Sequence, residues 1–498
     1  MSFSFHTYDA IDLAKLVKSR EVSPRELVEA AFARIDEVNP LLNAVVRTRR
    51  QAALKEADEI NVDDSTQPFA GVPFLLKDIS QAIGGEPLTS GALMMKNHIA
   101  KRDSNFVAQI RNGGFIPLGH TNTPEFGLKN ITEPALYGPT RNPWNTEYSP
   151  GGSSGGAAAA VASGIVPVAG ASDGGGSIRI PASFTGLFGL KPTRGRTPVG
   201  PGVGRQWQGA SIDFALSRSV RDSAAMLDLL QTVQPEAAFQ TPLYPGSYFD
   251  DLLKPIGRKL RIAYTTASPV GTPVSEEATK AVLRTVKFLE GEGHDVEERL
   301  SPVNGVRLME NYYTMNAGEV AAMFTTLEGM LGRAIRADDV DIVTWVLGEA
   351  GKKVMASEFV HSLNEWDIAA AQMSSLFKRY DLYVTPTNAD SAPKIGELTQ
   401  RADEIEKLLH ISEMSKEDQR RMIYTMFEPS LTYTPFTQLA NLTGQPAMSI
   451  PVHLTPAALP VGVQVMSSKG REDLLLQVAA QLESSELWVG MKGNPYFS

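Results

Sequence analysis

The apolar positions of the chain repeat at helical spacing in some stretches and form short continuous runs in others, so helices and strands are predicted to alternate. The capping box Ser23-Pro24-Arg25-Glu26 opens a helical repeat over residues 27–38, and Asn39-Pro40 is predicted to end it. A short apolar run over 68–78 predicts a strand that ends in Lys77 and Asp78. At the end of an arbitrary strand, a lysine more often emerges into solvent than stays buried.

The same alternation continues along the chain and indicates an α/β fold. Residues 106–111 are predicted helical and 115–119 extended, and His120 opens the loop that follows. Further helices are predicted over 51–60, 219–230, 275–289, most of 305–380 and 472–482, and further strands over 260–264, 294–298, 381–387, 447–452 and 461–466. The strongly charged stretch 397–426 is predicted to be a solvated helical insertion or cap.

Residues 151–196 break this pattern, because they contain two glycine-rich turns that each carry serine. An isolated GGSSGG segment is most often a flexible linker. Here the helix-forming alanines of 157–162 and the apolar residues of 165–169 follow it, which indicates buried structure. The segment also fits the G-x-S-x-G nucleophile elbow, but that motif needs a preceding strand, and a polar loop precedes it here. No P-loop lysine follows the glycines, so nucleotide binding is poorly supported.

The second glycine turn, Asp173-Gly174-Gly175-Gly176-Ser177, places a hydroxyl directly after backbone N–H groups that no side chain covers. Such donors can stabilise an oxyanion, and each is worth about 10²–10³ in rate in acyl transfer. A serine that attacks a carbonyl also needs a base. His120 is a candidate base by composition, but no spacing in the sequence ties it to Ser177.

The composition narrows the class of protein. Of 498 residues, 42% are hydrophobic and 21% are charged, which is typical of a folded globular protein. The net charge of −9 gives no overall basic field, so no direct nucleic-acid ligand is expected. The chain has no cysteine, which removes disulfides and thiolate chemistry. Residues 1–20 do not have the pattern of a secretory signal, and no apolar run approaches the roughly 20 residues of a membrane span, so a cytoplasmic protein without membrane contact is expected.

Four motifs together resemble the amidase signature family of serine hydrolases. They are GVPFLLKD at 71–78, GGSSGG at 151–156, DGGGSIR at 173–179 and GLKPTRGR at 189–196. The combination is much more specific than any one motif, and the likeness extends from the N-terminal capping box through NLTGQP and GVQVM to the closing helix. The resemblance implies a large mixed twisted β-sheet with helices on both faces and a mostly helical variable insertion.

The resemblance also implies one domain over residues 1–498. Within it, we expect an N-terminal helical region at about 1–65, a signature core at about 66–230 and a variable, largely helical region at about 300–430.

By position, the resemblance implies a Ser-cisSer-Lys triad in which Ser177 is the nucleophile, Ser153 relays protons and Lys77 is the base. In the family, the peptide bond before the relay serine, here Gly152–Ser153, is cis. Lys77 must be neutral to act as a base, so burial has to lower its pKa from about 10.4.

The remaining site residues follow from the same motifs. The backbone amides of Gly174, Gly175, Gly176 and Ser177 would hold the oxyanion, and position 174 is often β-branched in the family but glycine here. Supporting roles are expected for Ser154, Asp173 and Arg179. No cofactor and no metal are implied.

The implied reaction is hydrolysis of a small or linear carboxamide. The segments TNTPEFG, LPVGVQVM and GREDLLLQVA look most like aminohexanoate cyclic-dimer (nylon oligomer) hydrolases and nearby bacterial amidases. Substrate contacts are expected from about 127–131, 312–316 and 387–393, with Asn316 either a polar pocket group or a surface residue.

Two other functions stay open. One is the glutaminase component of a tRNA-dependent amidotransferase, which would need partner chains. The other is an inactive scaffold, which the three filled triad positions disfavour. The expected partner is a small-molecule amide, and the sequence is compatible with a homodimer.

Overall fold

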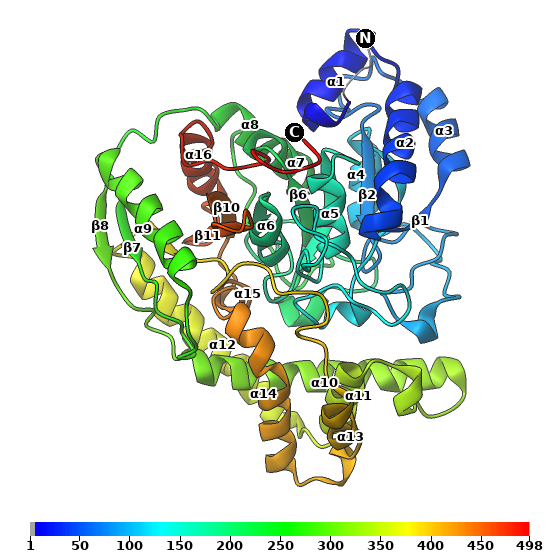
Figure 1. Cartoon of the computed structure of the whole chain (residues 1–498), viewed down its shortest axis with the longest axis vertical. Coiled ribbons are helices and arrows are strands. Elements are labelled where there is room, and N and C mark those ends of the chain that lie inside the picture. Colours follow the sequence, from blue (N-terminus) through cyan, green and yellow to red (C-terminus); the bar gives the residue numbers. More distant parts are fainter. Residues whose placement is uncertain (1–4, 498) are drawn as a thin grey trace.

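The structure, a computed structural model, describes residues 5–497 and is built around one 11-stranded mixed sheet (Figure 1). The strand order is β1-β3-β2-β4-β6-β5-β10-β11-β9-β7-β8. The strands are β1 Val45–Thr48, β2 Pro73–Lys77, β3 Ile116–Thr121, β4 Val168–Asp173, β5 Phe188–Lys191, β6 Ile212–Ser217, β7 Arg261–Tyr264, β8 Asp295–Glu298, β9 Leu382–Pro386, β10 Ala447–Leu454 and β11 Pro460–Ser467.

Antiparallel pairs form the middle of the sheet, from β4 through β6, β5, β10 and β11 to β9. Parallel pairs flank them, with β3, β2 and β4 on one side and β9, β7 and β8 on the other. The central strands are buried along almost their whole length, which agrees with a sheet covered on both faces. The predicted α/β class with a large mixed sheet is confirmed.

Helices surround the sheet. They are α1 Ala10–Lys18, α2 Pro24–Leu42, α3 Arg50–Glu59, α4 Asn105–Asn112, α5 Gly155–Ala162, α6 Arg179–Thr185, α7 Val220–Leu230, α8 Tyr248–Asp251, α9 Glu276–Gly291, α10 Gly305–Leu331, α11 Ile342–Gly351, α12 Ala356–Phe377, α13 Ala402–Leu409, α14 Lys416–Tyr433, α15 Gln438–Thr443 and α16 Glu472–Glu483. Short 3₁₀ turns occur at Phe5–Thr7, Leu93–Met95, Glu125–Gly127, Gln206–Gly209, Ala337–Asp339 and Ile411–Glu413. Within residues 5–497, no helix combines the length and the apolar character that crossing a bilayer requires.

The N-terminal capping box forms as predicted, but α2 does not end where the sequence pattern indicates. Glu26 N donates to Ser23 Oγ at 3.2 Å, and Ser23 N donates to Glu26 Oε2 at 2.8 Å. The helix then passes through Pro40 to Leu42, which is fully buried. The packing of Leu42 therefore extends α2 past the end that Asn39-Pro40 predicts. Asn43, at φ 50°, ends the helix in a left-handed conformation.

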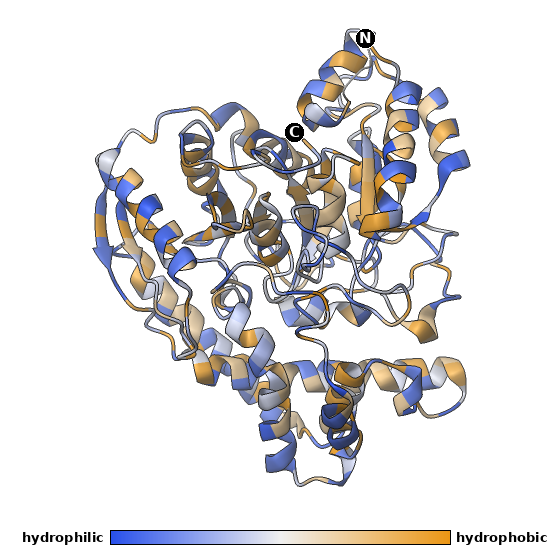
Figure 2. Ribbon diagram, viewed as in Figure 1, coloured by the Kyte–Doolittle hydropathy of each residue, from blue (hydrophilic) through white to orange (hydrophobic). Residues whose placement is uncertain are grey.

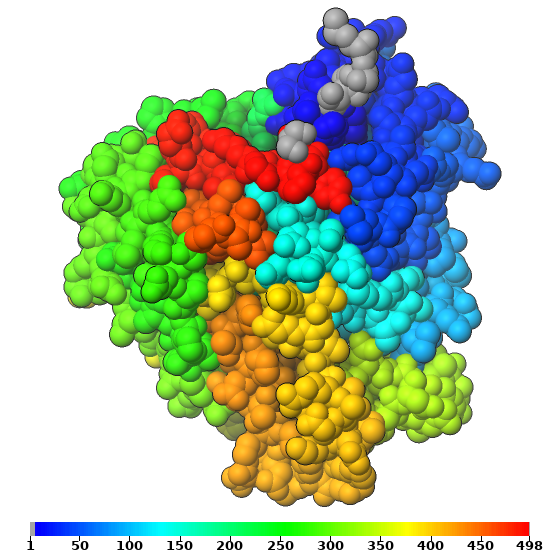
Figure 3. Space-filling model, in the orientation of Figure 1, coloured from blue at the N-terminus to red at the C-terminus, as the bar shows by residue number. Residues whose placement is uncertain are grey.

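Helices α10–α14 form a layer below the sheet in Figure 1, with α13 and α14 at its lower edge. A separate apolar cluster packs α10, α11, α13 and α14 together and includes Phe324, Leu408, Ile411, Ile423 and Met426. Figure 2 shows hydrophilic and hydrophobic residues interspersed along these helices. In the space-filling view, α13 and α14 form a lobe of their own (Figure 3). The charged stretch 397–426 is thus helical as predicted, but it also contributes core residues.

Candidate active site

Lys77 ends β2 and is fully buried, whereas the general pattern for such a position favours an exposed lysine. Its Nζ lies 2.7 Å from Ser153 Oγ and 3.0 Å from Ser172 Oγ. Burial lowers the pKa of Lys77 to about 7, and the charges of Asp213 and Asp173 act in the opposite direction. Near neutral pH, a large fraction of Lys77 is therefore an uncharged amine that can accept a proton.

Ser153 lies in the first glycine turn, just before α5. The Gly152–Ser153 peptide bond is cis, and the Ser153 side chain is almost completely buried. All residues of α5 are buried, because its glycines and alanines let neighbouring segments approach closely. A Cβ at Gly156 would lie 2.3 Å from Asn122 N. The small residues after the turn thus seat Ser153 in the interior, beside Lys77.

Ser154 ties the first turn to β4. Its Oγ accepts from Ser172 N at 3.3 Å and donates to Ser172 O at 3.2 Å. Both of these bonds go to the backbone of Ser172 rather than to the expected triad, and the supporting role of Ser154 stays a prediction. Ser172 itself was not predicted as a site residue, and its only sequence signal is a hydroxyl in an otherwise apolar buried strand that leads into the second glycine turn.

Ser177 follows the second glycine turn and is half-buried. It lines a cavity of about 340 Å³ together with Lys77, Ser153 and Ser172. The structure therefore brings the three residues of the expected triad to one cavity, although they come from three separate segments of the chain.

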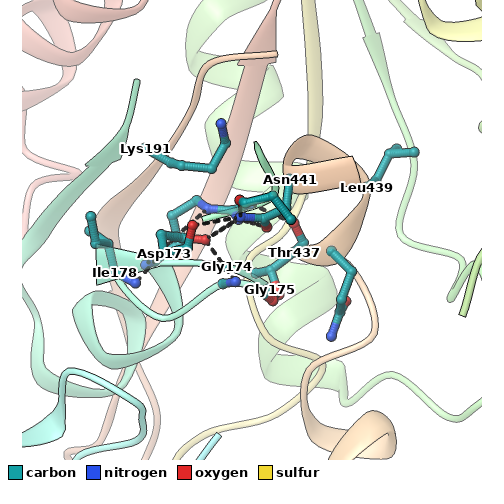
Figure 4. A network of polar contacts seen from close by, with 12 residues as sticks. Asp173, Gly174, Gly175, Ile178, Lys191, Thr437, Leu439 and Asn441 are labelled. Carbon is teal, nitrogen blue, oxygen red and sulfur yellow. Dashed lines mark hydrogen bonds and ion pairs between the residues drawn. The ribbon is translucent and has the colours of Figure 1, made fainter. Parts of the chain in front are cut away.

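Asp173 and Arg179 form a fully buried ion pair that shapes the second turn. Figure 4 shows Asp173 among its neighbours Ile178 and Asn441. Arg179 Nε and Nη2 donate to the Asp173 carboxylate at 3.0 and 2.9 Å, and Ile178 N donates to it at 3.2 Å. Burial opposes ionisation of Asp173, but the charge and hydrogen bonds of Arg179, with Asn441, outweigh it and hold the pKa at about 2. The carboxylate therefore stays charged and keeps the loop wrapped around it.

The same ion pair joins the second turn to the C-terminal part of the chain. Arg179 donates to Thr437 O at 2.8 Å, to Asn441 Oδ1 at 2.7 Å and to Gln464 Oε1 at 2.5 Å. Asn441 Nδ2 in turn donates to Asp173 O and Oδ1 at 2.9 and 2.8 Å. Asp173 and Arg179 thus occupy the loop-organising positions expected for them, and Asn441 and Gln464 are further members that the sequence pattern did not reveal.

Hydrogen bonds to their carbonyl oxygens fix the orientation of the glycine amides. The Tyr312 hydroxyl donates to Gly174 O at 3.0 Å, and the Thr437 hydroxyl donates to Gly175 O at 2.7 Å. In a trans peptide, C=O and N–H point in opposite directions, so these bonds also orient the N–H of the following residue. In the described part of the chain, no acceptor binds the N–H groups of Gly174, Gly175 or Ser177, and all three residues line the cavity.

Gly176 departs from the expected oxyanion role. Its N–H donates to Asp173 Oδ1 at 2.8 Å, and the residue is not part of the cavity lining. Its φ of 126° and a gap of 2.2 Å between a hypothetical Cβ and Thr437 Oγ1 explain why glycine occupies the position. The Gly176 N–H is thus already bonded to the Asp173 carboxylate. Gly174, Gly175 and Ser177 are the residues of this turn that line the cavity.

Gln81 and Asp213 form a polar connection to the backbone of Lys77. Strands β2 and β4 pair only at Leu75 and Ala169 and then separate. The Gln81 amide bridges the gap, because its Oε1 accepts from Lys77 N at 2.8 Å and its Nε2 donates to Ala171 O at 3.2 Å. Gln81 Nε2 also lies 3.2 Å from Asp213 Oδ1. Burial raises the pKa of Asp213, while its hydrogen bonds and the charge of Lys77 lower it.

Two of the three segments expected to contact substrate do line the cavity. Gly127, Asn130, Tyr312 and Asn316 all face it, and Asn316 Oδ1 accepts from Trp207 Nε1 at 2.8 Å. Asn316 is therefore a pocket group rather than a surface residue. Residues 387–393 do not line the cavity, because this segment packs beside α6 and α14 instead.

The rest of the cavity wall combines apolar side chains with polar ones, the latter including Ser80, Lys129, Gln206, Ser211, Ser430, Thr434 and Gln438. The apolar members that the sequence did not indicate come mainly from two 3₁₀ turns, α10 and α14, and they include Phe126, Trp207, Met309, Met323, Phe427 and Leu431. The sequence pattern did not identify these residues as part of the cavity wall, because they lie in charged or irregular segments. Only the fold brings them to the same cavity as the serines.

His120, the other candidate base, lies outside the cavity lining. Its Nε2 contacts Gln81 O at 3.1 Å, and burial, with the charge of Arg47, lowers its pKa to about 4. Lys77, rather than His120, has the hydroxyl contacts that proton transfer needs. Among residues 5–497 there is also no group of three or more His, Cys, Asp or Glu side chains arranged to hold a metal ion.

Comparison with known proteins identifies proteins that are similar to this chain over nearly its whole length. The Amidase family model matches residues 26–476. A lipoamidase of Enterococcus faecalis is 40% identical over 476 residues, which cover 96% of this chain and 63% of that protein. The chain thus spans less than two thirds of the length of that relative.

A 6-aminohexanoate-cyclic-dimer hydrolase of Paenarthrobacter ureafaciens is 37% identical over 491 residues, which cover 97% of this chain and 96% of that protein. A solved structure of 6-aminohexanoate cyclic dimer hydrolase complexed with substrate superposes with a TM-score of 0.89 at 35% identity, and the match covers 99% of this chain and 100% of that one.

Proposed function

The chain belongs to the amidase signature family, and from this membership we propose that it hydrolyses the C–N bond of a small or linear carboxamide through an acyl-serine intermediate. The observation that carries the proposal is the contact of a fully buried Lys77 with Ser153, 2.7 Å from Nζ to Oγ, in a cavity that Ser177 also lines.

The first half of the proposed reaction forms the acyl-enzyme. Neutral Lys77 accepts the proton of Ser153, which accepts the proton of Ser177 as Ser177 Oγ attacks the carbonyl carbon. The amides of Gly174, Gly175 and Ser177 stabilise the negative oxygen of the tetrahedral intermediate. The C–N bond then breaks, and the leaving nitrogen takes a proton from Ser153, which is restored from Lys77.

The second half releases the acid. Water enters in place of the amine, gives its proton through Ser153 to Lys77 and attacks the ester carbon of acyl-Ser177. Collapse of this second tetrahedral intermediate returns the proton to Ser177 Oγ and frees the carboxylic acid.

The cavity wall supports an amide with an apolar body. Lys77 and Lys129 are its charged members among the described residues, and no carboxylate lines it. Free glutamine carries an ammonium group, and no carboxylate of the cavity wall could pair with this charge, so its burial would cost free energy. The cavity thus favours an apolar carboxamide over the glutaminase alternative.

A cyclic-dimer hydrolase function stays a second candidate, because the solved structure of that enzyme superposes with a TM-score of 0.89. A panel that contains linear amides, the 6-aminohexanoate cyclic dimer and free glutamine separates the three. Ammonia release from glutamine, with no turnover of the other two, would contradict the amidase proposal. Cytoplasmic location and homodimer formation stay predictions from the sequence.

The nucleophile is tested by covalent labelling. A fluorophosphonate should label the wild-type protein at Ser177, and Ser177→Ala should lose both the label and turnover while keeping the thermal transition of the wild type. A label that persists on another serine in Ser177→Ala would refute the assignment.

A further inference from the structure

A second, larger cavity of about 850 Å³ lies between α10, α12 and α14, next to the catalytic cavity. Tyr313 belongs to the walls of both cavities. On the catalytic side its neighbours are Met309, Phe427 and Leu431, and on the far side they are Thr314, Ala317 and Tyr424. The proposed reaction does not use the second cavity.

An aromatic stack separates the two cavities. The rings of Tyr313 and Phe427 are nearly parallel, 10° apart with centroids at 4.8 Å, and Tyr424 meets Tyr313 edge-on at 5.9 Å. Tyr313 is 7% exposed, and burial raises the pKa of its hydroxyl well above the usual value, so the ring stays uncharged. The partition is therefore a set of neutral rings held by packing, which a rotamer change can open.

The wall of the second cavity is charged, in contrast to the catalytic cavity. Lys416 and Arg420 both bind one carboxylate, that of Glu358, and the Arg420 contact is 2.7 Å. Over the whole wall, four Lys and Arg side chains stand against three Glu side chains, which leaves an excess of one positive charge, and the cations that share Glu358 keep unused N–H donors. The other charged members are Arg307, paired with Glu365, Arg421, paired with Asp418, and the exposed Glu310 and Glu417.

We propose that the second cavity is a distal subsite of the same active site, which binds the carboxylate end of a linear amide whose apolar segment crosses the Tyr313–Phe427 partition. This inference rests on the proposed function. The apolar side chains of the catalytic cavity next to the partition, Met309, Phe427 and Leu431, take the middle of such a substrate, and the cations beside Glu358 bind its end. Arginine and lysine donate charge-assisted hydrogen bonds to carboxylates, which gives the subsite its preference.

The charge preference is tested with a homologous series of linear amides that end in a carboxylate, a neutral methyl group or an ammonium. At equal length, the wild type should have the highest kcat/KM for the acid. Arg420→Gln and Lys416→Gln should reduce the acid-to-neutral ratio of kcat/KM by about tenfold, which corresponds to about 1.4 kcal/mol. Arg336→Gln is the matched control, because Arg336 is an exposed, ion-paired arginine outside both cavities, and the ratio should not change.

The partition is tested by chain length. Tyr313→Ala and Phe427→Ala should shift the preferred length toward longer acids, whereas Tyr313→Phe keeps the ring and should keep the wild-type length profile. Circular dichroism and thermal unfolding identify a variant that has lost its fold, and Phe427→Leu then replaces it.

Two results would overturn the inference without touching the proposed function. One is equal kcat/KM for acid and neutral amides in the wild type, and the other is an unchanged length profile in the folded alanine variants, each with Ser177 still labelled by fluorophosphonate. A wild-type protein that hydrolyses no amide and takes no label overturns both proposals together.

Discussion

At the scale of single residues, the environment of Lys77 decides both reactivity and stability. Its Nζ has two hydroxyls as near neighbours, Ser153 and Ser172, and the charges that act on it from further away are those of Asp213 and Asp173. Burial therefore prevails and lowers the pKa of Lys77 to about 7. A base with this pKa is uncharged above neutral pH and protonated below it.

The pH profile should report this titration. We expect kcat/KM for an uncharged amide to rise as pH increases through about 7 and then to level, because the neutral amine is the reactive form. The measurement is kcat/KM from about pH 5 to about pH 10 in buffers of constant ionic strength. A profile that falls with rising pH through this range would exclude Lys77 as the base.

Asp213→Asn should move that profile. The negative charge of Asp213 raises the pKa of Lys77, whereas burial lowers it. Without that charge the pKa of Lys77 should fall, and the rise of kcat/KM should occur at lower pH. The amide introduced by this substitution keeps an oxygen that can accept the hydrogen bonds from Ser80 and Gln81. A loss of kcat without any shift of the limb would instead indicate a purely structural role for Asp213.

Lys77→Met should stabilise the protein while it removes activity by several orders of magnitude. The folded pKa of about 7 lies below the unfolded value of about 10.4, so the unfolded chain binds the proton more tightly. Burial of Lys77 therefore lowers the free energy of unfolding of the wild type. This loss is complete below about pH 7 and disappears as pH rises from the folded to the unfolded pKa of Lys77. Accordingly, the gain in Tm over wild type should be larger at about pH 6 than at about pH 10, and thermal scans at both values measure it.

At the scale of elements, α14 makes two sets of contacts that its charged sequence did not predict. One side packs through Ile423 and Met426 into the apolar cluster of the helical layer, and Phe427 and Leu431, one helical turn apart, face the catalytic cavity. Ser430 O also accepts from Asn130 Nδ2 at 3.0 Å, which fastens the helix to the catalytic wall.

Ile423→Ala tests whether α14 contributes to binding. Loss of the buried side chain should cost about 2–5 kcal/mol and loosen the helix locally. We expect KM for apolar amides to rise more than kcat falls, and hydrogen exchange over 416–433 to become faster. An equal fall of kcat at unchanged KM would place the effect on the triad instead.

The elements most open to prediction were those with local signals. The capping box at Ser23 and the helical periodicity predicted α2 and α9, and both helices form, with Ser23 and Ser275 as their N-caps. The motifs located Lys77, Ser153 and Ser177, which the fold brings to one cavity.

The parts that escaped prediction depend on contacts between distant segments. Continuation of α2 past Pro40 depends on packing, and the burial of Lys77 depends on neighbouring strands. The hydrogen bond from Gly176 N to Asp173 depends on the path of the turn, and the residue types alone do not predict that path. Asn441 and Gln464 join the site only because β10 and β11 lie between β5 and β9 in the sheet.

At the scale of the whole molecule, strands from the C-terminal part occupy the middle of the sheet. β10 and β11 lie between β5 and β9, so they connect the parallel group that contains β2 with the parallel group that contains β7. The hydrogen bonds of Arg179 to Thr437, Asn441 and Gln464 add a second connection between the signature core and the C-terminal part.

A chain that ends at Tyr433 should therefore fail to fold cooperatively. It lacks α15, β10, β11 and α16, which exposes the edges of β5 and β9 and leaves the Asp173–Arg179 pair without its partners. We expect no sharp thermal transition and no fluorophosphonate label, with full-length Ser177→Ala as the folded control. Native-like near-ultraviolet circular dichroism in the fragment would contradict this expectation.

On the ribosome, Lys77 and both serines of the proposed triad emerge long before the residues that hold the second glycine turn. Asn441 follows Asp173 by 268 positions, so at elongation rates of about 5–20 residues per second the nascent chain carries Ser177 for at least about ten seconds before the turn can be fixed. During that interval, the second turn lacks the Asn441 carboxamide and the Thr437 hydroxyl, which bond to Asp173 and Gly175. We therefore expect hydrolytic activity to appear only after synthesis has passed β11.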